Sequence, residues 1–115
     1  MDPITLAILA YTAFTIIIYV SITISTIVDW FHNRSALKEE NKQLVAFTLA
    51  DRLNGKQYAE VSGVFGQSTT PNRVIQGLYD KGSNKIVDAR KVLGRKVDDD
   101  VVAQHQKGAG LVVYS

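Results

Sequence analysis

The chain of 115 residues contains no cysteine and only two histidines. The absence of cysteine excludes disulfide bonds, thiolate nucleophiles and cysteine-ligated metal sites, and gives no reason to place the protein in an oxidising compartment. His32 and His105 lie far apart in the sequence, and neither has the neighbours at ligand spacing that a zinc site requires. We therefore expect no metal and no cofactor.

Recognisable catalytic motifs are also missing. The sequence has no phosphate-binding loop, no G-x-G-x-x-G and no G-x-S-x-G. The acidic cluster Asp98-Asp99-Asp100 is better suited to the start of a short helix, where the helix dipole favours negative charge, than to a cation site. His105 as a general base would need a nucleophile beside it, and the sequence indicates none. We expect a protein that is not an enzyme.

Charge is absent from residues 4–28, and all 13 lysines and arginines follow this stretch. A helix of about 25 residues at ~1.5 Å per residue would be about 37 Å long, more than the ~30 Å hydrocarbon core of a bilayer. Asp29 and Trp30 come next, as a charged stop and an interfacial aromatic residue. A cleaved signal peptide fits less well, because no positive charge precedes the apolar run. The pattern predicts a transmembrane helix over residues 4–28, after a short tail at 1–3.

Basic residues close to the predicted span set its orientation. Arg34, Lys38 and Lys42 follow the span closely, and no basic residue precedes it. The positive-inside rule then places the N-terminus outside and the rest of the chain in the cytoplasm. We expect a single-pass membrane protein with a polar juxtamembrane segment at 29–43 and a small cytoplasmic domain at 44–115.

Hydroxyl side chains recur at helical spacing within the predicted span. Small and hydroxyl-bearing side chains let two helices approach closely and hydrogen-bond across their interface. Alternatively, each hydroxyl bonds to a carbonyl of its own helix and has no further role. The candidate helix-association face consists of Thr12, Thr15, Tyr19, Thr23 and Thr26.

Two patterns compete between residues 35 and 53. Leu37, Leu44 and Phe47 keep helical spacing, and good helix formers dominate the first half of the segment. Residues 45–53 also alternate as a strand does, and Asn54-Gly55 is a typical hairpin turn. We favour a helix over residues 35–53 and keep the strand as the open alternative.

The remaining segments have clearer signals. Residues 58–65, 73–80 and 85–93 are predicted strands, with a loop at 67–72 and a hairpin joining the last two strands. Residues 98–107 are a predicted helix and 111–114 a final strand. The predicted fold class is α+β: a transmembrane helix followed by a mainly antiparallel sheet of three or four strands with one or two helices.

Two further features are candidates for binding. Gly63 and Gly77 occupy similar positions in two predicted strands, where they mark either bulges or a close approach of backbone or ligand. A cluster of cations can contact anionic headgroups or an acidic partner, or can simply protect a sheet edge. Aromatic residues are not interleaved with it, so we do not expect nucleic acid. This candidate basic patch consists of Lys85, Arg90, Lys91, Arg95 and Lys96.

Two functional hypotheses follow from these expectations. The first is a non-enzymatic anchor or adaptor in the lipid bilayer, whose cytoplasmic domain binds a protein partner, with strand addition at the C-terminal strand as the means. The second is a small membrane-active, toxin-like effector that acts by self-association of its transmembrane helix. In both hypotheses the partner is another protein or a second copy of the chain.

Overall fold

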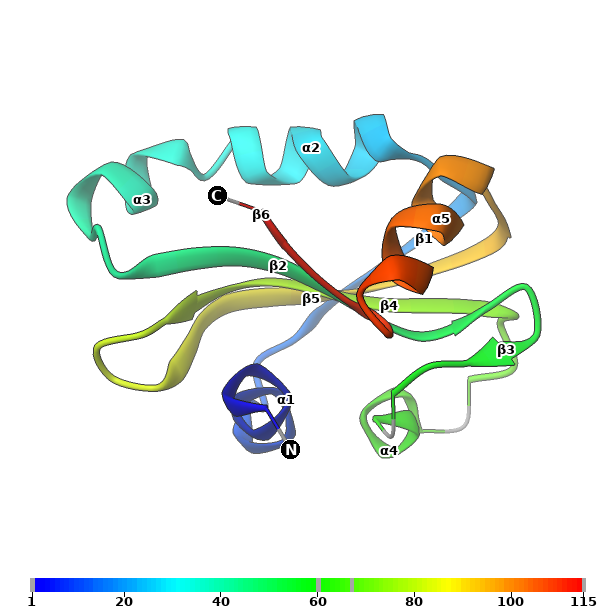
Figure 1. Ribbon diagram of the computed structural model, residues 1–115, viewed down its shortest axis with the longest axis horizontal. Coiled ribbons are helices and arrows are strands. Elements are labelled where there is room, and N and C mark those ends of the chain that lie inside the picture. The colour runs from blue at the N-terminus through cyan, green and yellow to red at the C-terminus, as the bar shows by residue number, and fades with distance from the viewer. Residues whose placement is uncertain (1, 60, 67, 115) are drawn as a thin grey trace.

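The computed structural model describes residues 2–59, 61–66 and 68–114. These residues form a mixed sheet of six strands in the order β1-β5-β4-β2-β3, with β6 paired to β2 on the same side as β3. Helices α1 and α4 lie on one face of the sheet, and α2, α3 and α5 lie on the other (Figure 1). In chain order the elements are α1 (Pro3–Ala10), β1 (Thr15–Ile22), α2 (Ile24–His32), α3 (Ser35–Glu40), β2 (Leu44–Leu53), β3 (Lys56–Gln57), α4 (Ser62–Phe65), β4 (Asn72–Asp80), β5 (Lys85–Val97), α5 (Asp99–Lys107) and β6 (Leu111–Tyr114).

The predicted transmembrane helix is not formed. Residues 4–28 are divided among α1, β1 and the first half of α2. Within residues 2–59, 61–66 and 68–114, no helix has the length and apolar character needed to cross a bilayer. The predicted fold class, which began with such a helix, is therefore wrong, as is the predicted localisation as a single-pass membrane protein with an outside N-terminus and a cytoplasmic domain.

Local signals inside the apolar run explain its division. Thr15–Ile22 consists almost entirely of β-branched residues with one tyrosine, and such residues favour strands over helices. The Asp2 carboxylate caps α1, accepting hydrogen bonds from the Thr5 amide at 2.8 Å and the Thr5 hydroxyl at 2.6 Å. Thr23 caps α2 in a reciprocal capping box with Thr26. Two caps and a β-branched centre thus produce three short elements.

Strand β1 joins the sheet beside β5, far from it in sequence. The two strands are parallel, in a register that runs from Thr15 opposite Arg90 to Ile22 opposite Val97. Strands β5 and β4 form the predicted antiparallel hairpin, which is confirmed. Helix α5 and strand β6 also confirm the predicted helix and final strand. Strand β1, which was predicted to be part of a transmembrane helix outside the domain, is therefore the edge strand of the domain's sheet.

The favoured helix over residues 35–53 is wrong in its second half. Only Ser35–Glu40 is helical, and Leu44–Leu53 is a strand. Strand β2 lies inside the sheet and has helices on both faces, so nearly all its side chains are buried. Burial of both faces favours apolar residues throughout a strand, which weakens the alternation that identifies it.

The predicted strand over residues 58–65 is also wrong. Residues 62–65 form the short helix α4, while Glu60 of the predicted strand and Gln67 of the predicted loop lie outside the described residues. Val61 and Phe65 are both buried in the apolar cluster that also contains residues of α1. Their separation of four residues puts them on one side of a helical turn and equally on one face of a strand, so the spacing alone does not distinguish the two structures.

Each face of the sheet has its own apolar core. Ile8 of α1 packs with Phe47 and Ile75 on one face, and all three are fully buried. Ile27 of α2 and Val101 of α5 pack on the other face and are buried to the same degree. A smaller third cluster is centred on Trp30. The two helical layers are therefore held to the sheet mainly by burial of aliphatic side chains.

Gly77 lies where neighbouring groups leave no space for a side chain. A Cβ atom there would lie 2.9 Å from the Ala89 Cβ, 2.9 Å from the Asp88 carbonyl oxygen and 3.0 Å from the Phe47 ring. A Cβ at Gly63, in α4, would have no atom within 4 Å. The two glycines therefore do not mark equivalent positions, and close packing of the protein itself explains Gly77.

We expect Gly77→Ala to lower the free energy of unfolding by about 1–3 kcal/mol, because overpacking displaces the adjacent strand. Gly63→Ala is the matched control and should leave stability unchanged or slightly raise it, since alanine favours helix. Urea unfolding followed by circular dichroism measures both. Equal effects of the two substitutions would contradict the close packing at Gly77.

Candidate functional site

The candidate helix-association face is not a single face in the structure. Thr12 lies in the loop after α1, and Thr15 is exposed at the start of β1. Thr23 caps α2. Tyr19 in β1 and Thr26 in α2 lie on the inner side of these elements, where both contact one residue of the candidate basic patch.

That residue is Arg90, which is buried under α2. Its Nε donates to the Gln76 side-chain oxygen at 2.7 Å, and its Nη1 and Nη2 donate to the Tyr19 hydroxyl at 3.1 Å and the Thr26 carbonyl at 3.2 Å. The Trp30 ring lies 5.5 Å from the guanidinium carbon, within reach of a cation–π interaction. Among the described residues no carboxylate lies within 4 Å of Arg90. Neutral oxygens and an aromatic ring therefore stabilise this buried cation.

The other four members of the candidate basic patch are distributed along β5. Lys85 is exposed at the hairpin turn, and Arg95 and Lys96 are exposed near the other end of the strand. Lys91 is half-buried and, as the neighbour of Arg90 in a strand, points to the opposite face. The structure does not bring these five cations together at one surface.

His105 is fully buried between α5 and β2. Its Nδ1 lies 2.7 Å from the Val101 carbonyl and therefore donates to it, which leaves Nε2 to accept from the Thr48 hydroxyl at 2.8 Å. The Tyr114 hydroxyl lies 3.2 Å from the Thr48 hydroxyl. Burial lowers the pKa of His105 below its usual 6.5, although the bond to Val101 opposes this. This histidine is placed to join α5 to β2 in its neutral form.

The acidic cluster lies at the start of α5, as predicted, and its side chains are exposed. Asp98 is the N-cap residue, but its side chain makes no capping hydrogen bond. The cluster does not orient His105, whose Nδ1 partner is a backbone carbonyl. Within the described part of the chain no three or more His, Asp or Glu side chains are arranged so that they could hold a metal ion together.

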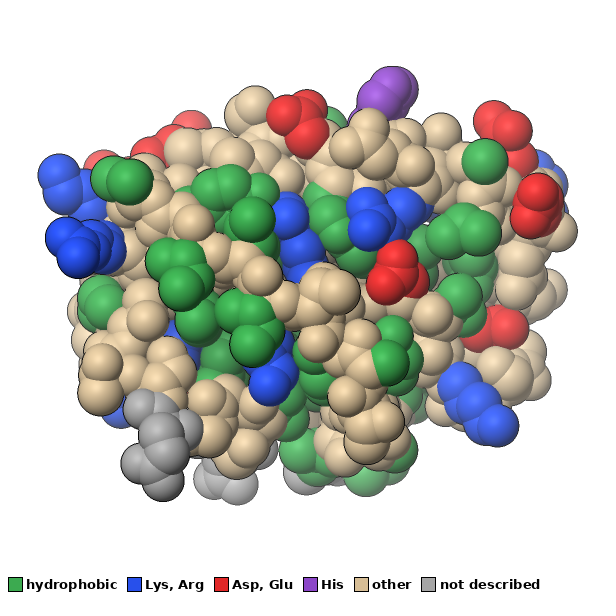
Figure 2. Space-filling model, turned by 180° about the vertical axis from the view of Figure 1, so that it is seen from behind, with side chains coloured by type: hydrophobic (Ala, Val, Ile, Leu, Met, Phe, Trp, Pro, Cys, Tyr) green, Lys and Arg blue, Asp and Glu red, His purple; other side chains and the backbone are tan. Residues whose placement is uncertain are grey.

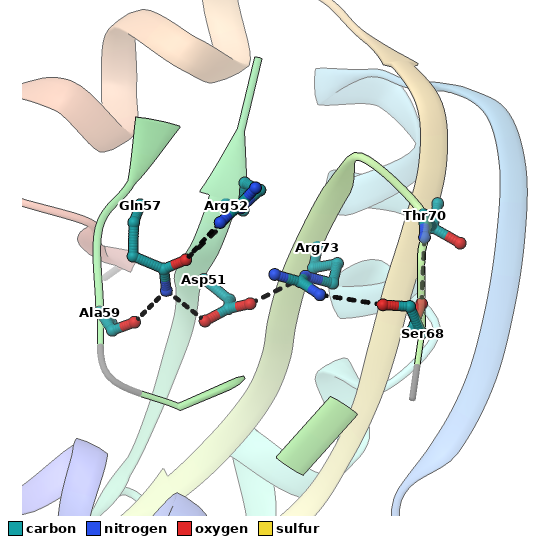
Figure 3. A network of polar contacts seen from close by, with 7 residues as sticks. All are labelled: Asp51, Arg52, Gln57, Ala59, Ser68, Thr70 and Arg73. Atoms are coloured by element: carbon teal, nitrogen blue, oxygen red, sulfur yellow. Dashed lines mark hydrogen bonds and ion pairs between the residues drawn. The ribbon is translucent and has the colours of Figure 1, made fainter. Parts of the chain in front are cut away.

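A second buried network connects the segment around α4 to the sheet (Figure 3). The fully buried carboxylate of Asp51 lies 2.9 Å from Nε of Arg73, and Nε2 of Gln57 donates to it at 2.7 Å. Gln57 also donates to the Ala59 carbonyl, and Arg73 donates to the Ser68 carbonyl. These bonds connect β2 and β4 to both ends of the α4 segment, which indicates a structural role.

Gln76 and Thr48 were not singled out in the sequence, yet both are fully buried hydrogen-bonding residues. A polar side chain inside an otherwise apolar strand was the available signal. Its partners could not be identified in the same way, because Gln76 binds the Ile27 carbonyl from a distant element.

The most accessible unusual surface is the outer edge of β1. Among the strands that the structure describes, β1 pairs with β5 alone and so ends the sheet. On its inner face Ile17 and Tyr19 pack against the core under α2. On its other face Ile16, Ile18 and Val20 are 60%, 67% and 77% exposed. We call these three side chains and the free strand edge beside them the β1 edge.

The β1 edge lies at the back of Figure 1, on the side that faces the viewer in Figure 2, where hydrophobic side chains gather among lysines and arginines. Leu6 and Leu9 of α1 add exposed aliphatic surface. Sheet edges are usually protected by charged side chains, proline or bulges, and Thr15–Ile22 contains no charged residue and no proline. A long, uncharged, aliphatic edge strand is typical of a site that pairs with another strand.

Comparison of the chain with protein-family descriptions, curated proteins and solved structures gives no match.

We expect Arg90→Met to lower the free energy of unfolding by about 2–4 kcal/mol, since buried acceptors on β1, α2 and β4 lose a charged donor. Arg95→Met, at an exposed position of the same strand, is the matched control and should change it by less than about 0.5 kcal/mol. Chemical denaturation of both variants measures the difference. Equal destabilisation would show that Arg90 does not join these elements.

The lowered pKa of His105 makes stability depend on pH. The unfolded chain binds a proton at this residue below about pH 6.5 while the folded chain resists it, so the free energy of unfolding should fall as the pH decreases through that range. We therefore expect the free energy of unfolding to be lower at about pH 5.5 than at about pH 7.5, because protonation of His105 favours the unfolded chain. Urea unfolding at the two pH values measures it.

His105→Gln should reduce this pH difference, whereas His32→Gln, at an exposed position, should retain it. If His105→Gln does not fold, proton NMR of the wild-type imidazole rings provides the second measurement. A His105 ring that titrates at or above pH 6.5 would contradict the prediction.

Proposed function

We propose that the protein is a non-enzymatic interaction module that pairs with a second copy of itself through the β1 edge. The observation that carries this proposal is the row of three exposed aliphatic side chains on an uncharged edge strand of eight residues whose outer edge is open. An added strand would satisfy the open backbone groups and place its own side chains next to the aliphatic row on the same face of the sheet.

The β1 edge is complementary to itself. In an antiparallel pair centred on Ile18, each Ile18 faces its own copy and each Ile16 faces Val20 of the other chain. Aliphatic cross-strand pairs of this kind contribute roughly 0.2–1 kcal/mol each. Two-fold pairing uses the same surface on both chains and closes after two copies, so it does not lead to fibres.

The charges beside the β1 edge are compatible with such a pair. Lys91 lies next to Ile16 in the register of β1 and β5, so the β5 strands bring the nearest cations. In the proposed dimer the two β5 strands are three strand spacings apart, about 14 Å. This separation exceeds the Debye length of about 8 Å at physiological ionic strength, so repulsion between the cations is largely screened.

The opposite edge of the sheet supports pairing less well. It is shared by β3, with two residues, and β6, with four, although Val113 of β6 is 54% exposed. Strand addition at the C-terminal strand, as expected from the sequence, would therefore have a shorter and divided edge to use. The longer β1 favours the self-pairing proposal.

We expect the purified chain, of 12.7 kDa, to form a dimer of twice this mass with a micromolar dissociation constant. The dimer should predominate as the concentration approaches ~100 μM. Ile18→Lys should convert it to a monomer, because each dimer would then bring two like charges together at its centre. Val113→Lys places the same charge at the opposite edge and should leave the dimer intact. Sedimentation equilibrium measures all three proteins.

Hydrogen exchange then locates the interface. Amides of residues 15–22 should exchange more slowly in concentrated than in dilute samples, because the outer amides of β1 become hydrogen-bonded only in the dimer. A wild-type monomer over the whole concentration range would refute self-pairing. So would a dimer that persists in Ile18→Lys.

A further inference from the structure

A groove of about 510 Å³ lies between α2, α3 and the sheet, on the face opposite α1. Ala46 and Leu78, which are almost completely buried, form its floor. Phe31 of α2 and Tyr114 of β6 line it with aromatic rings whose centres are 5.2 Å apart. The floor and walls of this groove are therefore mainly apolar, and the small Ala46 side chain contributes to its depth.

The rim of the groove has an excess of positive charge. Arg34, Lys38 and Lys42 line it together with a single carboxylate, that of Glu39. Arg34 is already neutralised by Asp88, whose carboxylate lies 2.7 Å from its Nε.

The two lysines are different from Arg34. In the part of the chain that the structure describes, neither Lys38 nor Lys42 has a carboxylate within 4 Å. Lys38 is half-buried, so its aliphatic stem extends the apolar wall while its ammonium group remains in solvent. Two uncompensated ammonium groups thus lie beside an apolar hollow.

We propose that this groove binds a small amphipathic anion, namely an aliphatic chain that ends in a carboxylate. The chain would lie on Ala46 and Leu78 beside the two aromatic rings, and the carboxylate would be held by Lys38 and Lys42 as charge-assisted hydrogen-bond donors. The volume falls in the range of roughly 300–1,000 Å³ that small-molecule sites occupy.

The groove is separate from the β1 edge. It contains residues of β2, β4 and β6 but none of β1. Strands β1 and β6 lie at opposite edges of the sheet (Figure 1). Ligand binding and self-pairing are therefore independent, and the Ile18→Lys variant should retain the ligand site.

The test uses sodium decanoate as the probe and isothermal titration calorimetry of the full chain. We expect one decanoate per chain with a dissociation constant in the micromolar range, and at least tenfold weaker binding of the uncharged amphiphile octyl glucoside. The double variant Lys38→Gln/Lys42→Gln should weaken decanoate binding about tenfold, because two ion-pair contacts are lost.

The matched control is Lys81→Gln/Lys85→Gln, which removes the same charge at the exposed turn between β4 and β5 and should leave the affinity unchanged. Ala46→Leu fills the floor and should abolish binding, with circular dichroism to verify folding. The proposal is overturned if decanoate does not bind, if octyl glucoside binds equally well, or if the Lys38/Lys42 variant retains wild-type affinity.

Discussion

The position of the N-terminal segment depends on the solvation of one buried cation. A guanidinium group that leaves water without oxygen partners is strongly destabilising. Arg90 obtains those partners from three other elements: Tyr19 in β1, Thr26 in α2 and Gln76 in β4. Gln76 in turn donates to the Ile27 carbonyl. A strand, a helix and the central hairpin are thereby fixed relative to one another, and the apolar residues around them pack in one arrangement.

The same interaction shows what the sequence could not reveal. Tyr19 and Thr26 were identified as a hydroxyl face and Arg90 as part of a basic patch, but their positions differ by 71 and 64 residues. No local pattern connects residues so far apart. Hydropathy alone also does not distinguish an apolar run that crosses a bilayer from one that is divided between an edge strand and two short helices. The β-branched residues of Thr15–Ile22 were a local signal against one long helix.

Elements with strong local signals were predicted correctly. The β4–β5 hairpin has a turn between two strand-like runs, and α5 is acidic at its start and basic at its end. For residues 44–53 the helix was favoured and the strand kept as an alternative, because neighbouring strands determine the outcome: β4 pairs along one edge of β2 and β6 pairs with the other. Val61 and Phe65 were assigned to a strand for a related reason. Their spacing fits both a strand and a helix, and packing in the core determines which of the two forms.

The exposure of the β1 edge follows from where α1 lies. Helix α1 packs with residues of β4 and β5, including Ile75 and Ala89, and so does not extend over the outermost strand. Ile17 is partly buried under α2, whereas Ile18, one residue further along, is mostly exposed. Apolar surface left in water forfeits roughly 25 cal/mol for each Å² that another surface would cover. Because the strand edge also has open hydrogen-bonding groups, a second strand can pair with these groups and at the same time pack its side chains beside Ile16, Ile18 and Val20, whereas a helix or a small ligand would leave the backbone groups open.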